Sequence, residues 1–203
     1  DDEREAIAAA YDLAGYGAEV VPGLVETLTA EAEMTRRNAA YALSAIGAPA
    51  VDALIDTLGH DQADTRTDAA TTLGDIAVAA TDALPALITA SRDPHEDVRK
   101  AAAEALGIIG QSSPEVVPAL IDAVGDEHAG VRTAAVFALC RLGPHAAEAV
   151  AALEGVLDDD NRYIRGDALH ALQRIDTPLA KDTLIKHLMP ARWCPITTPE
   201  STF

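Results

Sequence analysis

Apolar side chains recur along this chain at steps of three and four residues. The clearest stretch is 98–109, where the apolar positions are Val98, Ala102, Ala105, Leu106 and Ile109. These positions share one face of a helix and do not alternate as they would in a strand. The pattern predicts a helix whose buried face consists largely of alanine, which lets neighbouring helices approach closely.

A second apolar pattern alternates with the first and predicts a shorter helix before each long one. Its copies read PGLVETL, DALIDTL, PALITAS, PALIDAV, AALEGVL and DTLIKHL. Proline in the first turn of a helix costs little, because the missing amide hydrogen has no helical partner there; this suits Pro22, Pro85 and Pro118. A glycine directly after a helix favours a left-handed cap, which we expect at Gly47, Gly110 and Gly143.

An arginine returns once in each unit. It stands seven residues before a leucine, at intervals of 30, 33, 33 and 33 residues, as Arg36, Arg66, Arg99, Arg132 and Arg165. The run 39–58 matches 9–28 almost residue for residue, which places an earlier copy at the N-terminus with Ala6 in the arginine position. Such a period predicts an array of helical repeats, each burying its apolar face against its neighbours.

The segments DPHEDVRKAAAEALGIIG and DEHAGVRTAAVFALCRLG resemble HEAT repeats, in particular the short HEAT-like class of the phycobilisome lyases. The resemblance extends over about residues 5–189. It implies an all-α fold, an α-solenoid that is a right-handed superhelix of antiparallel helix pairs. In that fold an outer helix ends near an aspartate, an inner helix begins at a Val-Arg step, and the inner helices line a concave binding surface. We expect about six units in 1–189, the first and last incomplete, and an extended tail in 190–203.

The repeated arginine predicts a structural ladder. An aspartate stands six residues before three of the arginines and five before a fourth, at Asp93, Asp126, Asp159 and Asp61. Carboxylate and guanidinium then flank one turn and form charge-assisted hydrogen bonds along the stack. A row of anion-binding arginines would need side chains free of acidic neighbours, which this sequence does not offer.

The charge of the chain excludes several partners. Its 203 residues carry a net charge of −18, which disfavours nucleic acid and anionic membranes, because both reward clustered cationic side chains. No stretch of about 18 uncharged apolar residues predicts a membrane span. High acidity with little lysine fits either a salt-rich cytoplasm or an ordinary acidic bacterial protein. With no signal peptide visible, we expect a cytoplasmic protein.

Residues able to carry chemistry are few. Cys140 and Cys194 are too few for a disulfide framework and show no CxxC spacing, which favours a reducing compartment. We expect Cys140 to be a small packing residue on an inner helix and Cys194 to be a free thiol. No two of the six histidines share the i, i+4 spacing of a helical metal site. We therefore expect no catalytic residue, no metal and no cofactor.

Two rows of variable residues define a candidate binding face on the inner helices. One row stands one residue after the arginine position and the other five residues after it, so the two lie four residues apart on one side of each helix. Aromatic residues with a few charges are typical anchors of protein or peptide sites. The candidates are Tyr11, Arg37, Tyr41, Thr67, Thr71, Lys100, Glu104, Thr133, Phe137 and His170. In the alternative interpretation, Tyr11 and Tyr41 only cover the N-terminal end and Phe137 packs between layers.

The tail PARWCPITTPESTF contains three prolines and the only tryptophan, Trp193. It either docks back on the last layer as a cap or engages a partner. The sequence as a whole predicts a non-enzymatic scaffold that binds a protein or peptide on its concave inner face. Two alternatives remain: a chromophore lyase subunit or chaperone-like partner resembling the phycobilin lyases, or an accessory domain of a larger enzyme.

Overall fold

Short outer helices and long inner helices alternate along the computed structural model, which describes residues 12–111 and 113–192. The outer helices are α2 (Val21–Thr27), α4 (Val51–Thr57), α6 (Leu84–Ala90), α8 (Val116–Val124) and α10 (Val150–Gly155). The inner helices are α3 (Glu33–Ile46), α5 (Ala63–Ile76), α7 (Glu96–Ile109), α9 (Ala129–Leu142) and α11 (Arg162–Ile175). One further helix, α12 (Pro178–Arg192), follows them, and short 3-10 segments precede most outer helices.

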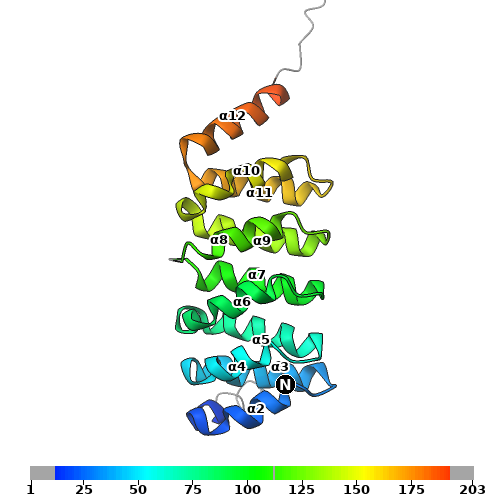
Figure 1. The fold of residues 1–203 in the computed structure, drawn as a ribbon, viewed down its shortest axis with the longest axis vertical. Helices are drawn as coiled ribbons and strands as arrows, with labels where there is room; N and C mark the ends of the chain where they lie inside the picture. The colour runs from blue at the N-terminus through cyan, green and yellow to red at the C-terminus, as the bar shows by residue number, and fades with distance from the viewer. Residues whose placement is uncertain (1–11, 112, 193–203) are drawn as a thin grey trace, which may run out of the picture.

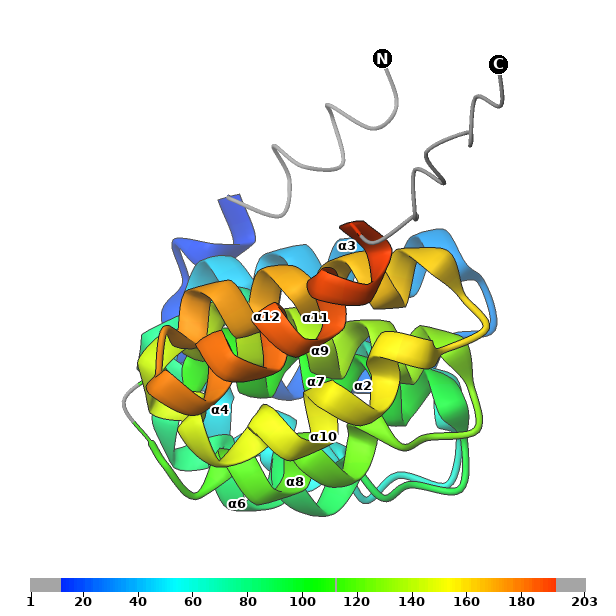
Figure 2. The same cartoon turned by 90° about the horizontal axis from the view of Figure 1, so that it is seen from above.

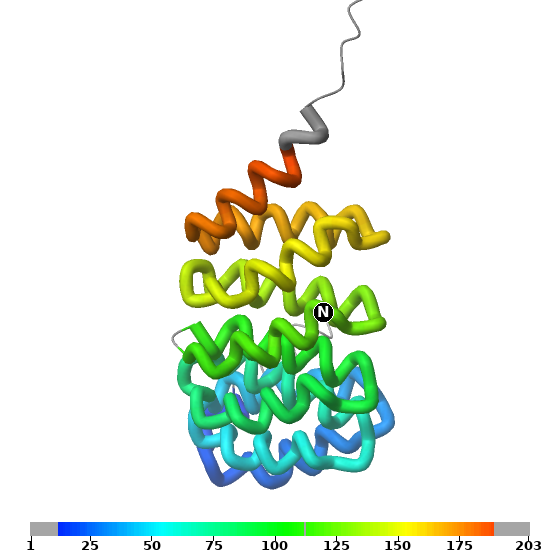
Figure 3. The backbone as a smooth tube through the Cα atoms, turned by 45° about the horizontal axis from the view of Figure 1, so that its top comes forward, coloured from blue at the N-terminus to red at the C-terminus, as the bar shows by residue number. Residues whose placement is uncertain are grey.

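Each outer helix pairs with the inner helix that follows it, and the pairs stack in chain order (Figure 1). Viewed from above, α3, α7, α9 and α11 lie toward one side and α6, α8 and α10 toward the other (Figure 2). The tube drawing follows the same order from blue to red, with α12 slanting away from the last layer (Figure 3). The described residues thus form the α-solenoid that the repeat pattern predicts.

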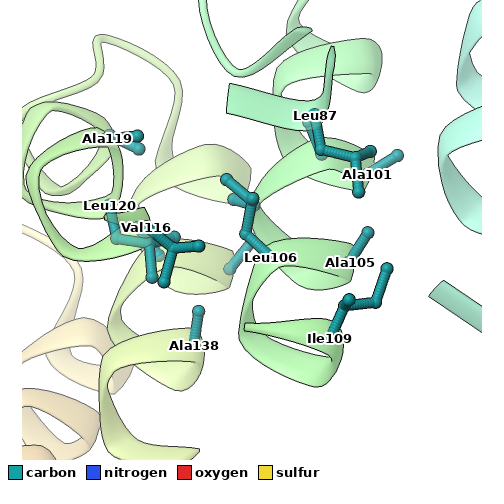
Figure 4. Close-up of a cluster of buried hydrophobic side chains, with 14 of the residues drawn as sticks. Leu87, Ala101, Ala105, Leu106, Ile109, Val116, Ala119, Leu120 and Ala138 are labelled. Carbon is teal, nitrogen blue, oxygen red and sulfur yellow. The ribbon is translucent and has the colours of Figure 1, made fainter. Parts of the chain in front are cut away.

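The core lies between layers and within each helix pair. The leucine seven residues after each arginine is fully buried, and so is the leucine near the middle of outer helices α4, α6, α8 and α10. In Figure 4, Leu106 of α7 points toward Val116 and Leu120 of α8, and Ala138 of α9 lies on that same side of Leu106. The layers are held together by many such leucine and alanine contacts and not by one globular core.

The inner helices begin slightly earlier than the resemblance implied. Each starts three residues before its arginine, so α7 begins at Glu96 and not at the Val98–Arg99 step. His95 stands before α7 in an extended conformation, and its Nδ1 accepts a hydrogen bond from the Asp97 N–H, which caps the free end of the helix. The prolines lie in the first turns of α2, α6 and α8, as predicted.

Gly47 and Gly143 have the positive φ expected of a left-handed cap, 73° and 54°, but their ψ values of −133° and −125° lie outside the left-handed helical region, so only the sign of φ is as predicted. Gly110 has φ of −81°, so the prediction is wrong there. A Cβ on Gly110 would lie 2.7 Å from the Leu106 carbonyl oxygen and 2.8 Å from a methyl group of Val116, so glycine is needed for close approach. Ala77 takes the positive φ of 58° in its layer without being a glycine.

The C-terminal boundary also differs from the prediction. Helix α12 continues to Arg192, so the first three residues assigned to the extended tail are helical. Trp193 and Cys194 lie outside the described residues, as does Tyr11 at the other end. The half-buried Cys140 packs against the core from α9, as expected, and burial raises the pKa of its thiol.

Two continuous helical stretches, Ala63–Ala90 and Ala129–Asp158, are long and apolar enough to cross a membrane by length and composition alone. Each contains an inner helix, a 3-10 turn and the next outer helix. The backbone reverses at Ala77 and at Gly143, where φ is positive, so neither stretch is one straight helix. Their apolar character is accounted for by burial in the solenoid, which covers 44% and 50% of the respective windows.

Candidate functional site

The repeated arginines join consecutive layers. Arg99 donates from Nε and Nη2 to the two carboxylate oxygens of Asp126, at 2.7 and 3.0 Å. Its Nη1 donates to the carbonyl oxygens of Asp93 and Pro94, at 2.9 and 3.2 Å, in the turn before its own helix. Arg66 and Arg132 repeat this arrangement with the carboxylates of Asp93 and Asp159. The side chains of Arg99 and Asp126 are only 11% and 12% exposed, so each pair is a largely buried bidentate bridge.

Each ladder carboxylate also shapes its own turn. Asp159 Oδ1 accepts from the Asn161 N–H at 2.8 Å, and Asp93 and Asp126 accept from the N–H two residues further on in the same way. The Arg132 guanidinium holds the pKa of the Asp159 carboxyl below its usual value, and the Asn161 N–H contributes in the same direction. Burial is the largest single influence on the pKa values of Asp93 and Asp126 and would raise them, but the arginine hydrogen bond and charge together with the backbone N–H bond outweigh it, so both pKa values are lowered.

The ladder changes at both ends, and Asp61 is not its carboxylate. Asp61 accepts from Arg66 Nη1 only through its backbone carbonyl oxygen, at 3.0 Å. Arg36 instead binds Asp68 at 2.8 Å and Asp64 at 3.3 Å, both on α5. Arg165 donates to two carbonyl oxygens of its own turn and meets no carboxylate within 4.0 Å among the described residues. The ladder therefore has three regular bridges and two modified ends.

Two hollows adjoin on the inner face. The first, here called the acidic hollow, has a volume of about 400 Å³ and lies across α3, α5 and α7. The second, here called the apolar hollow, has a volume of about 580 Å³ and lies between α7 and α9. Lys100 and Glu104 line both, so the two form one continuous surface that we call the inner groove.

Six of the ten candidate binding residues line the inner groove: Thr67, Thr71, Lys100, Glu104, Thr133 and Phe137. Phe137 is 51% exposed, so it faces the hollow and is not packed between layers. Arg37 and Tyr41 are exposed on α3, and His170 is exposed on α11, but none of the three belongs to the groove lining. The two predicted rows thus meet in one groove over the central layers.

Several lining residues were missed by the sequence rows. On the acidic side they are Glu33, Arg36, Asp64, Asp68, Asp97 and Ala101, and on the apolar side Ile108, Gly130, Ala134, Ala138 and Arg141. Most stand three or four residues from a predicted position: Asp97 precedes Lys100 by three, and Arg141 follows Phe137 by four. Extending each row by one helical turn in both directions would have found them.

The described residues hold no group of three or more histidine, cysteine or carboxylate side chains placed to bind a metal ion. Charge is uneven along the groove. Five carboxylates and two cationic side chains line the acidic hollow, whereas Lys100, Glu104 and Arg141 are the charged residues of the apolar hollow. The arrangement suits recognition of a charged, partly apolar surface.

The comparisons with known proteins agree with the solenoid fold. The family model for HEAT repeats matches residues 1–74, 51–140 and 117–192. The chain therefore belongs to the HEAT repeat family, and its α-solenoid is that of the family. No curated protein matches the chain significantly.

Three known structures, one of them a homology model, illustrate the likeness in fold. A chain from the complex of CpcE and CpcF of phycocyanin lyase from Nostoc sp. PCC7120 superimposes with a TM-score of 0.68 at 24% identity, over 75% of this chain and 98% of that one. Computationally designed armadillo repeat proteins for modular peptide recognition superimpose with a TM-score of 0.57 at 20% identity, over 85% of this chain and 93% of that one. A homology model of the full-length AP-3 complex superimposes with a TM-score of 0.75 at 20% identity, over 96% of this chain and 38% of that one. At these identities the likeness concerns the fold.

Proposed function

We propose that this chain is a non-enzymatic scaffold that binds a protein or peptide partner in the inner groove. The observation that carries the proposal is the position of Phe137, a large aromatic side chain half exposed on the wall of a 580 Å³ hollow with charged residues at its margins. Exposed aromatic side chains in a concave apolar site with a polar rim are the usual anchors of protein interfaces.

Relatives support the proposal without identifying the partner. CpcE occurs in a complex with CpcF, Kap95p binds RanGDP, and designed armadillo repeats recognise peptides. All of these chains share the stacked-helix fold, which presents one long face to a binding partner.

A photo-crosslinking experiment tests the proposal. A photoreactive amino acid replaces Thr133 in the groove or, as the control, Val78, which is 76% exposed on the turn between α5 and α6. After irradiation in a lysate of the source organism, we expect a protein to be linked from position 133 and not from position 78. The same link should disappear in a Phe137→Ala background. Equal linking from both positions, or none from position 133, would contradict the proposal.

A second candidate function is a subunit of a chromophore lyase. The observation in its favour is that nearly the whole of the phycocyanin lyase chain superimposes on this one. Mixing the purified protein with a free bilin distinguishes the two functions. A lyase subunit should shift the visible absorption band of the bilin and lose the shift in Phe137→Ala, whereas a protein scaffold should leave the spectrum unchanged.

A further inference from the structure

We infer that the partner enters the inner groove as an extended peptide segment with a defined order of charge. It carries basic residues over α3, α5 and α7, an apolar side chain beside Phe137, and an acidic group at Arg141. The inference rests on the proposed function and gives the chemistry of the partner.

The basic segment follows from the excess of carboxylates in the acidic hollow. Glu33, Asp64, Asp68, Asp97 and Glu104 face two cationic side chains there. Arg36 is already held by Asp64 and Asp68, and Glu33 by Arg37 at 3.0 Å, which leaves Asp97 as the lining carboxylate without a lysine or arginine partner in the described part of the chain. Lys100 is 4.0 Å from Glu104, and both side chains are about half exposed. This surplus of negative charge, concentrated in a concave surface, attracts and orients cationic side chains of a partner.

The apolar anchor follows from the next stretch of the groove. Ile108, Ala134, Phe137 and Ala138 line a hollow large enough for an aromatic or branched aliphatic side chain. Phe137 is half exposed to solvent, so covering it removes apolar surface from water. Fully desolvated aromatic contacts near the centre of an interface contribute most of its binding energy.

The acidic group follows from Arg141. It lines the apolar hollow from α9, four residues after Phe137, is exposed, and has no carboxylate within 4.0 Å among the described residues. In a chain of net charge −18 this cationic side chain stands out. A guanidinium binds a carboxylate in a bidentate manner, which fixes the register of the bound segment.

The dimensions favour an extended chain. The inner groove crosses the four inner helices α3, α5, α7 and α9. With neighbouring axes about 8–10 Å apart, it spans roughly 24–30 Å. A peptide rising about 3.3 Å per residue covers that span with about seven to nine residues, which is enough to carry the three features in order.

Fluorescence anisotropy with two labelled nine-residue peptides tests the charge order. The first is Lys-Lys-Gly-Lys-Gly-Trp-Gly-Gly-Glu, and the second, Lys-Glu-Gly-Lys-Gly-Trp-Gly-Gly-Lys, exchanges its second and ninth residues, so the two peptides have the same composition and net charge. We expect the first to bind at least tenfold more tightly at low salt, and its affinity to fall at least threefold in Phe137→Ala and in the double variant Asp97→Asn, Glu104→Gln. Asp52→Asn, an exposed carboxylate on outer helix α4, serves as the control and should change nothing.

Equal affinity for the two peptides, no binding of either, or insensitivity to the groove variants would overturn the inference. The crosslink at position 133 separates this failure from failure of the proposed function. If the linked partner contacts the groove through a segment without basic residues, the scaffold function stands and the charge order is wrong. If position 133 links to nothing, the scaffold function itself fails.

Discussion

Gly107 and Ala138 meet backbone to backbone where α7 packs on α9: a Cβ built on Gly107 would lie 2.6 Å from both Cα and Cβ of Ala138. That distance is far shorter than a carbon–carbon contact, so only glycine allows the two helices to approach this closely. Ala138 also lines the apolar hollow. The missing methyl group of Gly107 therefore allows α7 and α9 to pack closely beside the hollow.

Gly107→Ala is expected to destabilise the protein by about 1–3 kcal/mol, because α7 and α9 must separate to admit the methyl group. Chemical denaturation measures the change. Gly166→Ala is the matched control, since Gly166 lies inside α11 and a Cβ added there would meet no atom within 4 Å. Because alanine has the higher helix propensity, the free energy of unfolding of this variant should rise by about 0.5–1 kcal/mol. Equal stability changes in the two variants would show that the close approach is not needed.

Ala77→Gly should stabilise the protein by about 1 kcal/mol. Ala77 has φ of 58° and ψ of −130°, a conformation that costs a residue with a Cβ about 1–3 kcal/mol and a glycine almost nothing. The reverse change Gly47→Ala, at φ of 73° with no atom near the new Cβ, should destabilise by a similar amount. Thermal unfolding of both variants checks the pair, and a drop in the melting temperature of Ala77→Gly would refute the assignment of strain.

Arg99→Ala should lower the free energy of unfolding by about 1.5–3 kcal/mol, because it removes hydrogen bonds between charged, largely buried groups and leaves the Asp126 carboxylate without its partner. Arg92→Ala is the comparison. Arg92 is 2.8 Å from Asp122, but both side chains are 62% exposed, so the free energy of unfolding should fall by only about 0–1 kcal/mol. Denaturant titration of both variants measures the difference. An unchanged midpoint in Arg99→Ala would mean that the ladder does not stabilise the stack.

The ladder also predicts the response to acid. The pKa values of Asp93, Asp126 and Asp159 are lowered in the folded state, so these groups bind protons more weakly there than in the unfolded chain. Their contribution is complete above the unfolded-state pKa of about 3.9 and is lost as the pH falls through the lower folded-state values. Unfolding free energies measured from pH 6 to pH 2 should fall less steeply in Asp159→Asn than in the wild type. Identical slopes would argue against the bridge.

The sequence predicted the ladder but could not assign its partners. Because the period is 33 residues, an aspartate six residues before one arginine is also 27 residues after the previous one. The carboxylate of Asp126 therefore fits Arg132 and Arg99 equally well on spacing alone, and only the structure shows that it binds Arg99 while its carbonyl oxygen binds Arg132. In the layer with the 30-residue interval the aspartate is displaced to Asp61, and the bridge is made by α5 instead.

Backbone conformation was predictable only where residue type determines it. Gly47 and Gly143 have the expected positive φ, whereas Gly110 is required by the nearby Val116 side chain and Ala77 adopts the same kind of turn without glycine. That Thr133 and Phe137 line one hollow was predictable, because helical spacing places them on one face of α9. The continuity of the groove was not predictable, since it depends on how neighbouring helices are set against each other in space.

The three regular bridges of the ladder all lie at the turns that lead from an outer helix to an inner one. At the opposite edge, the turns among the described residues make no side-chain hydrogen bond to another layer. Bending stiffness is therefore unequal across the stack. At the edge where the arginine–aspartate bridges lie, neighbouring layers stay joined. The layers therefore separate most easily at the opposite edge. Separation of the layers at that other edge leaves the three regular bridges intact.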